Sequence, residues 1–360
     1  MKLGIIGLPQ SGKTTIFNAL TRGDAPTTAS AGRMEVHTAV VDVPDPRLDR
    51  LAEMFQPRKP IHAKVTYADI AGLEGGAANP QGASRSGISG TLLNQLAQMD
   101  GFLHVVRCFA DENVPHSAGG VDPARDAAAM ESELLLNDLI AVERKLERLT
   151  EERKKGGADK VLNERQAALF TRLHVELSAE KPLREVEITA EEDKHLSGFG
   201  LLTRKPLLVL LNLGESQSAP EIKLTHPCPV VALQGKLEME IAQLAPDDAA
   251  FFMAEYDIAE PSLKRMIRLS YDLLHLQSFF TIGDDEVRAW AIHRGATASE
   301  AAGTVHTDMQ RGFIRAEVVP FEDLAALGGL AEARAKGKLR LEGKEYVVQD
   351  GEIVHIRFSV

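Results

Sequence analysis

The chain has 360 residues, of which 44% are hydrophobic, and it carries a formal net charge of −11 at pH 7. This length exceeds what one hydrophobic core usually organises, so we expect two or three domains. The acidic balance argues against a surface that is basic throughout, and no apolar stretch is long enough to predict a membrane-spanning helix.

The two cysteines, Cys108 and Cys228, stand in apolar or proline-flanked contexts without the spacing of metal ligands. We therefore expect both to be small core residues in a reducing compartment. The chain enters an apolar strand at once, and no signal-peptide pattern precedes it. These features predict a cytoplasmic protein with no membrane partner.

The first element in chain order is an apolar run, Leu3 to Ile6, that leads directly into GLPQSGKT at Gly7 to Thr14. This segment fits the phosphate-binding loop pattern GxxxxGK[ST], and a helix is predicted after it, from Thr15 to Leu20. A strand, a glycine-rich turn and a helix in this order aim backbone N–H groups at one point, which suits a triphosphate. The predicted nucleotide-binding residues here are Gly7, Pro9, Gln10, Ser11, Gly12, Lys13, Thr14 and Thr15.

A second motif, DIAGL at Asp69 to Leu73, ends one of three predicted parallel strands, which cover residues 36–43, 63–70 and 102–109. An aspartate at the end of such a strand can hold the hydration shell of Mg²⁺ beside the Thr14 hydroxyl. The glycine of DxxG can donate its N–H to a γ-phosphate. We therefore predict a metal site at Thr14 and Asp69, and catalytic roles for Lys13, Asp69 and Gly72.

The glycine-rich segment 74–90 is predicted to reorganise around the γ-phosphate as a switch. Beyond it, residues 126–179 show apolar residues at helical spacing among many charges, interrupted by Gly156 and Gly157. The pattern predicts an antiparallel helical hairpin. Its charged faces are either solvated or used to bind a partner.

After the hairpin, the apolar runs that follow Pro206 and Pro229 have the character of two further strands of the same sheet, which makes the hairpin an insertion. A helical pattern covers residues 261–276. Short strand candidates separated by glycine turns then predict a small α+β domain. These candidates cover residues 287–292, 314–319, 346–349 and 354–358.

Several motifs occur along nearly the whole chain, among them GLPQSGKTT, DIAGL, HVVRCF, VDPARD, NLGE and the tail segment VRAWAIHRGATASEAAGTVHTDMQRGFIRAEVV. Together they resemble the YchF-type Obg-like ATPases, a branch of the translation-factor GTPases. The resemblance implies an α/β P-loop NTPase fold, with a Ras-like G domain, an inserted helical coiled coil and a C-terminal β-grasp domain of the TGS type. The corresponding ranges are 1–125 with 201–276, 126–200, and 277–360.

The resemblance also bears on the choice of base. GTP-specific relatives carry NKxD, whereas this chain has NLGE at Asn212 to Glu215. Leu213 replaces the lysine that packs along the base, and the longer Glu215 misplaces the acceptor that reads guanine, so acceptance of ATP is expected. Residues Gln234, Gly235 and Lys236 stand where GTPases have a loop beside the base. The alternative, that NLGE only caps a strand, leaves GTP open.

No motif in the sequence identifies the group that positions the attacking water. The position that holds a glutamine in Ras-like proteins is Leu73, which cannot hydrogen-bond to water. The resemblance implies that His116, in the loop after HVVRCF, takes this role. A histidine in a polar loop is otherwise a solvated residue without a catalytic function.

This sequence departs from the family pattern in its switch segments. The stretch SAGRMEVHT replaces the usual one, which supplies a metal-contacting threonine; Arg33 falls near that position, and Thr27, Thr28 and Thr38 are candidate substitutes. Gln10 replaces an asparagine, and residues 74–87 lack the usual lysine-containing continuation. We expect binding of nucleotide to survive these changes better than hydrolysis, which is expected to be slow.

The function predicted from the sequence is a Mg²⁺-dependent hydrolase of ATP, with GTP as a second possible substrate, that acts as a switch on the ribosome. The ribosome or ribosomal RNA is the partner that the resemblance implies, and DNA is not expected. The alternative is a GTP-specific switch, or a scaffold that binds nucleotide without hydrolysing it and uses the hairpin to hold a protein partner.

Overall fold

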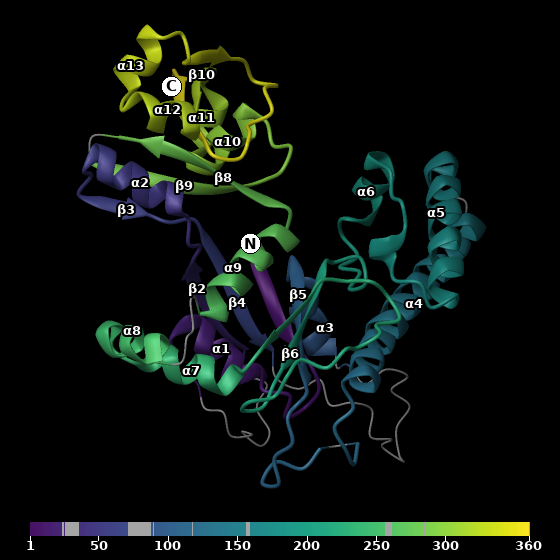
Figure 1. The fold of residues 1–360 in the computed structure, drawn as a ribbon. Coiled ribbons are helices and arrows are strands. Elements are labelled where there is room, and N and C mark those ends of the chain that lie inside the picture. The colour runs from purple at the N-terminus through teal and green to yellow at the C-terminus, as the bar shows by residue number, and fades with distance from the viewer. Residues whose placement is uncertain are drawn as a thin grey trace. The chain divides into compact units, whose positions relative to one another are not determined.

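The computed structural model describes residues 1–23, 25, 36–70, 88, 90–116, 118–155, 159–255, 261–283 and 285–359. The chain forms two compact units (Figure 1). We call them the first unit, Met1–Ala39 with Thr66–Leu263, and the second unit, Val40–Val65 with Lys264–Val360. No helix in these ranges is both long and apolar enough to cross a membrane.

A six-stranded sheet organises the first unit, and its strand order is β2-β4-β1-β5-β6-β7. The pairings of β1 with β4 and β5, of β5 with β6 and of β6 with β7 are all parallel, which confirms the predicted α/β architecture. The strands are β1 (Lys2–Ile6), β2 (Val36–Asp42), β4 (Lys64–Ile70), β5 (Gly101–Arg107), β6 (Leu207–Asn212) and β7 (Val230–Leu233). The helices beside them are α1 (Lys13–Thr21), α3 (Gly90–Ala97), α7 (Gly235–Gln243) and α8 (Pro246–Glu255).

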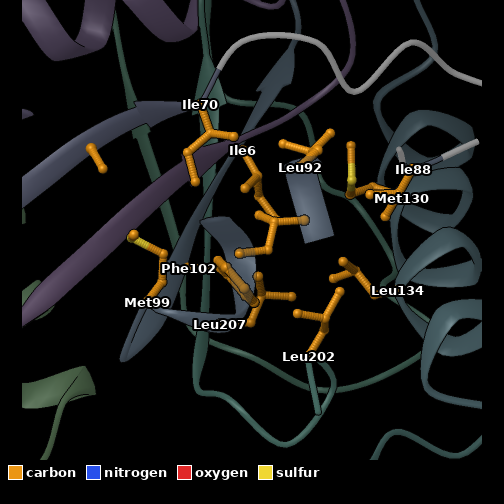
Figure 2. Close-up of a cluster of buried hydrophobic side chains, with 12 residues drawn as sticks. Ile6, Ile70, Ile88, Leu92, Met99, Phe102, Met130, Leu134, Leu202 and Leu207 are labelled. Carbon is orange, nitrogen blue, oxygen red and sulfur yellow. The ribbon is translucent and has the colours of Figure 1, made fainter. Parts of the chain in front are cut away.

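Buried apolar side chains join this sheet to the helices that pack on it. Figure 2 shows Ile6, Ile70, Phe102 and Leu207 from four neighbouring strands meeting Leu92 of α3. Each buried side chain of this size contributes roughly 1.5–3 kcal/mol to folding. The packed core fixes the ends of the strands, where the functional site lies.

The predicted helical hairpin is present between β5 and β6. It consists of α4 (Pro123–Lys155) and α5 (Lys160–Ser178), which lie side by side (Figure 1), followed by η1 (Leu183–Glu185) and α6 (Ala190–Leu196). The Asp159 carboxylate caps α5 by accepting from the N–H groups of Val161 and Leu162.

The base of the hairpin is tied to the chain that leads into β6. The buried Asp138 carboxylate on α4 accepts hydrogen bonds from the Leu202 and Thr203 N–H groups, both at 2.7 Å, and from the Thr203 hydroxyl at 2.6 Å. Burial raises the pKa of Asp138 to about 6 against the opposing effect of these hydrogen bonds. The hairpin is therefore anchored by polar contacts as well as by packing.

The second unit contains another six-stranded sheet, in the order β11-β10-β12-β8-β9-β3. Its strands are β3 (Lys59–Ile61), β8 (Leu276–Ile282), β9 (Glu286–His293), β10 (Phe313–Pro320), β11 (Arg340–Glu342) and β12 (Glu352–Phe358). Its helices are α2 (Pro46–Phe55), α10 (Ala298–Val305), α11 (Thr307–Arg311), α12 (Phe321–Leu327) and α13 (Leu330–Ala335), and α9 (Ser262–Leu273) leads into it.

Three of the four strands predicted here correspond to β9, β10 and β12, but the strand predicted at 346–349 is wrong. This segment forms only an isolated bridge between Val347 and Thr297. The backbone of the segment bonds to residues at the start of α10: the Ala298 N–H donates to the Tyr346 carbonyl oxygen at 2.7 Å, and the Val348 N–H donates to the Ala296 carbonyl oxygen at 3.1 Å. The Tyr346 hydroxyl donates to the buried Glu352 carboxylate at 2.7 Å.

Residues 40–65 differ from the sequence-based domain assignment, which placed residues 1–125 in one domain. In the structure, β3 pairs in parallel with β9, and α2 packs on the same strand. Arg47 of α2 binds Asp350 through Nη1 at 2.8 Å and Nη2 at 3.3 Å, and its guanidinium lies over the Phe280 ring. The segment that connects β2 to β4 therefore belongs to the second unit.

Candidate functional site

The loop between β1 and α1 needs glycine at two positions. Gly7 has φ of 153° and Gly12 has φ of 94°, both in the region that favours glycine. A Cβ atom on Gly7 would lie 2.4 Å from the Val105 carbonyl oxygen, and one on Gly12 would lie 2.2 Å from Asn212 Nδ2. Only glycine lets the backbone turn this closely over the ends of the strands, so that the loop leads into the N-terminus of α1.

Lys13 is held inside this loop. Its Nζ donates to the carbonyl oxygens of Gly7 at 3.1 Å and Leu8 at 3.0 Å. Burial lowers the pKa of Lys13 from 10.5 to about 8, although the negative charge of Asp69 works in the opposite direction. An anion in the loop offers this ammonium a stronger partner than two neutral carbonyls do.

Thr14 and Asp69 are brought together although 55 positions separate them, and the Thr14 hydroxyl donates to Asp69 Oδ2 at 2.7 Å. Asp69 is only 3% exposed at the end of β4. Its other oxygen, Oδ1, has no hydrogen-bond partner among the described residues. A buried carboxylate oxygen in this condition is costly unless a ligand satisfies it.

Asn212 connects the loop to the segment that precedes α7. Its Nδ2 donates to the Ser11 carbonyl oxygen at 2.9 Å, and its Oδ1 accepts from the Gly235 N–H at 3.0 Å. A Cβ on Gly235 would lie 2.7 Å from Asn212 Oδ1, so glycine is needed at this close approach as well. One buried amide therefore joins two segments that were assigned separately to phosphate and base binding.

The remaining residues predicted at the base site lie around this junction. Leu213 is half-buried, and its backbone N–H donates to the Leu233 carbonyl oxygen at 2.9 Å. Glu215 and Lys236 are exposed, and Gln234 precedes α7. Other residues near the loop are Pro9, Gln10 with a positive φ of 62°, and Thr15 on α1.

Sequence reasoning missed Gln217, which holds the NLGE loop in place. Its Nε2 donates to the Cys108 carbonyl oxygen at 2.8 Å, and its Oε1 accepts from the Gly214 N–H at 2.9 Å. These contacts tie the loop to the residue that follows β5. No sequence motif marks this glutamine, so only its contacts in the structure reveal its role.

A buried histidine, His104, was also missed, since it lies within an apolar strand. Burial lowers the pKa of His104 to about 3, and the positive charge of Lys13 contributes to the same shift. The imidazole on β5 is therefore neutral.

His116 forms its hydrogen bonds with its own loop and with α4. Its Nδ1 accepts from the Ala118 N–H at 3.1 Å, so the ring proton is on Nε2, which donates to Asp126 Oδ2 at 2.7 Å. Arg125 binds the other oxygen of Asp126 at 2.8 Å. In this arrangement both ring nitrogens are occupied, and the catalytic role of His116 remains a prediction.

Several predicted residues lie outside the described ranges: Gly72, Leu73, Thr27, Thr28, Arg33 and most of the switch segment 74–90. Of the candidate switch threonines, only Thr38 is described, and it is exposed on β2. The structure brings together Gly7, Gly12, Lys13, Thr14, Asp69, Asn212 and Gly235.

Two family models match this chain. Residues 2–139 match the model described as MMR_HSR1, 50S ribosome-binding GTPase, and residues 276–359 match YchF-GTPase_C, described as a protein of unknown function. The first match contains the glycine loop and Asp69. The second covers most of the second unit.

Full-length relatives agree with these matches. The chain is 39% identical to the ribosome-binding ATPase YchF of Bacillus subtilis, over 99% of both chains. It is 35% identical to the Obg-like ATPase 1 of Oryza sativa subsp. japonica, covering 100% of this chain and 92% of the relative. The structure of the Schizosaccharomyces pombe YchF GTPase is similar with a TM-score of 0.82 and 29% identity, over 99% of this chain and 97% of that one. On this evidence the chain belongs to the YchF family.

Proposed function

We propose that this chain is a nucleoside triphosphatase that binds ATP with Mg²⁺ in the glycine loop, and that its nucleotide state regulates an association with the ribosome. The observation that carries the proposal is the meeting of Lys13, Thr14 and Asp69 at the N-terminus of α1. The names of the full-length relatives, which include ribosome-binding ATPase, support the second part.

The residues at this site fit Mg²⁺. Thr14 and Asp69 offer oxygen atoms, which this ion prefers, and the buried Asp69 Oδ1 has no hydrogen-bond partner among the described residues. When bound, Mg²⁺ supplies positive charge to the β- and γ-phosphate oxygens as the γ-phosphoryl group leaves.

The protein groups contribute binding and charge stabilisation. Lys13 exchanges the carbonyl oxygens of Gly7 and Leu8 for the β- and γ-phosphates, and the loop N–H groups donate to the same anion. Asn212 fixes the position of the glycine loop relative to the start of α7, because its amide hydrogen-bonds to both Ser11 and Gly235. The loop is thereby preorganised before nucleotide arrives.

Water positioning is assigned to His116. In the free arrangement this imidazole is bound to Ala118 and Asp126, so it must exchange at least one of these hydrogen bonds to reach a water. Hydrolysis is expected to be slow because this exchange must come first. In addition, position 73 holds a leucine, which cannot orient water as the glutamine of Ras-like proteins does.

We assign the preference for ATP to Leu213 and Glu215. Guanine-specific loops use an aspartate that accepts two hydrogen bonds from the base, and the exposed Glu215 carries one more methylene. Leu213, half-buried against apolar neighbours, has no ammonium to place along the base. Both changes remove contacts that favour guanine.

The proposal is tested by comparing wild type with Lys13→Met and with Lys194→Met, an exposed lysine on α6 that serves as the control. We expect Lys13→Met to abolish both tight binding of ATP and phosphate release, with Lys194→Met unchanged. Cosedimentation with ribosomes, with and without a nonhydrolysable ATP analogue, tests the association. Equal binding by wild type and Lys13→Met would contradict the assignment of the site.

A further inference from the structure

An aspartate in the first turn of α4 holds the imidazole that is assigned to water positioning. His116 Nε2 donates to Asp126 Oδ2 at 2.7 Å, and these two side chains are only 6% and 5% exposed. The Nδ1 atom accepts from the Ala118 N–H. A carboxylate can only accept and a backbone N–H can only donate, so these partners assign the ring proton to Nε2 and the lone pair to Nδ1.

Arg125 fixes the other oxygen of the same carboxylate. Its Nε and Nη2 both donate to Asp126 Oδ1, at 3.0 and 2.8 Å, and Nη2 also donates to the Gly120 carbonyl oxygen at 2.7 Å. A guanidinium group supplies only donors, so Asp126 must present an acceptor on this side. Oδ2 is thereby left for the imidazole, and contacts on both oxygens hold the carboxylate in one orientation.

The loop that carries His116 is attached to the end of the sheet where the glycine loop lies. Arg107, the last residue of β5, donates through Nη2 to the Val114 carbonyl oxygen at 2.7 Å. The next residue, Cys108, donates its N–H to the carbonyl oxygen of Asn212, whose side chain binds the glycine loop. Ligands of open parallel sheets bind outside the carboxyl ends of the strands. His116 therefore follows Val114 on the side of the sheet where nucleotide is proposed to bind.

The two hydrogen bonds of the imidazole differ in how readily they can be exchanged. The bond to Asp126 is short and buried and has a charged acceptor, and such bonds are about twice as strong as those between neutral groups. The bond from Ala118 is longer, at 3.1 Å, joins neutral groups and lies at the exposed surface, where water can take the place of the imidazole. Breaking the second bond frees Nδ1 while His116 stays on Asp126.

We infer that Asp126 is a positioning residue for hydrolysis: it holds His116 through Nε2, so that Nδ1 exchanges the Ala118 N–H for the attacking water, which donates to it. The inference rests on the proposed function, which assigns water to His116, and it specifies the atom that the water meets. It also makes the first turn of the helical hairpin part of the hydrolytic arrangement.

The test uses the full-length variants His116→Ala, Asp126→Asn and His116→Ala/Asp126→Asn. Phosphate release at saturating ATP gives kcat, and titration with a fluorescent nonhydrolysable ATP analogue gives the affinity. In Asp126→Asn, the N–H groups of Arg125 take the amide oxygen, so the amide NH2 faces His116. This NH2 donates to Nε2 and moves the ring proton to Nδ1, which removes the lone pair that the water needs.

We expect Asp126→Asn to lower kcat by about tenfold to a hundredfold and to leave the affinity for the analogue within about twofold of wild type. Added to His116→Ala, Asp126→Asn should lower kcat no further, because it acts through the imidazole. Adding Arg125→Met to Asp126→Asn should recover part of the loss, since the amide can then turn its oxygen toward Nε2.

The matched control is Asp122→Ala, which alters the start of the same helix without removing a contact of the imidazole. Asp122 Oδ1 accepts from the Arg125 N–H at 3.1 Å, so this variant weakens the first turn of α4. We expect its kcat to equal that of wild type. The melting temperature of each variant is measured in parallel, so that kcat is compared only where the protein is folded.

Three results would overturn the inference: wild-type kcat in Asp126→Asn, a further loss of kcat when Asp126→Asn is added to His116→Ala, or a loss in Asp122→Ala equal to that in Asp126→Asn. Each of them leaves the proposed function standing when His116→Ala lowers kcat. Wild-type kcat in His116→Ala contradicts the assignment of water to this histidine and overturns the inference with it. If wild type releases no phosphate from ATP, the proposed function itself fails, and the inference fails with it.

Discussion

The Thr14 hydroxyl donates to the Asp69 carboxylate at 2.7 Å and so joins the start of α1 to the end of β4. In the nucleotide-bound protein, the same two oxygen-bearing groups are expected to turn toward Mg²⁺.

Replacing Asp69 with asparagine is expected to remove the dependence of nucleotide binding on Mg²⁺. The amide keeps a similar shape and can still accept from Thr14, but it lacks the negative charge that holds the ion's hydration shell. Titration of a fluorescent ATP analogue with Mg²⁺ and with EDTA measures the effect. If Mg²⁺ still tightens binding in Asp69→Asn as much as in wild type, Asp69 is not part of the metal site.

Nucleotide affinity is expected to fall at alkaline pH because of Lys13. Its pKa is lowered to about 8 in the free protein, and a bound triphosphate favours the charged form. Affinity is then nearly constant below about pH 7 and decreases about tenfold between pH 7 and pH 9. Lys13→Met, measured over the same range, should show weak binding with no such decrease.

The same pKa predicts a change in the stability of the free protein. The folded state favours uncharged Lys13, since its pKa lies below the unfolded value of 10.5. The resulting cost of folding is fully present below about pH 8 and disappears as the pH rises toward 10.5. The free energy of unfolding of wild type, measured in urea, should therefore increase between about pH 8 and pH 10.5 relative to that of Lys13→Met.

Asn212→Ala is expected to destabilise the first unit and weaken nucleotide binding together. The variant loses two buried hydrogen bonds and leaves the Ser11 carbonyl and the Gly235 N–H unpaired, which costs about 2–4 kcal/mol. Denaturant unfolding and ATP titration measure the two effects. A loss of binding without a loss of stability would indicate that Asn212 contacts the base directly and does not act by joining the two segments.

Arg47→Ala is expected to loosen residues 40–65 from the second unit. A double-mutant cycle with Asp350→Asn should give a coupling energy of about 0.5–1 kcal/mol, which is modest because both side chains are partly exposed. Hydrogen exchange of β3 reports the local effect. Unchanged exchange in Arg47→Ala would show that the pairing of β3 with β9 holds the segment without this arginine.

The glycine loop was readable from sequence because its residues are contiguous and its pattern reflects a single local geometry. Asp69 was readable because DxxG follows a strand in the expected order. The position of residues 40–65 was not readable, since a segment that connects two strands of one sheet is normally assigned to that sheet. Leu48 and Leu51 look the same in sequence whichever core they enter.

The contacts of His116 show a second limit of sequence reasoning. The motif context suggested a catalytic histidine, but the predicted hairpin began only at residue 126, whereas α4 begins at Pro123 and its first turn carries both Arg125 and Asp126. A hydrogen bond between a loop and a helix terminus leaves no periodic signal. Gln217 was missed for the same reason.

The most direct test of the central claim is phosphate release from ATP and from GTP by purified wild type, each with Mg²⁺ and with EDTA. We predict slow release that requires Mg²⁺, is at least about tenfold more efficient with ATP, equivalent to about 1.4 kcal/mol, and is absent in Lys13→Met. Release that persists in EDTA or in Lys13→Met would contradict the assignment of hydrolysis to Lys13, Thr14 and Asp69. A preference for GTP of similar size would show that Glu215 still reads guanine.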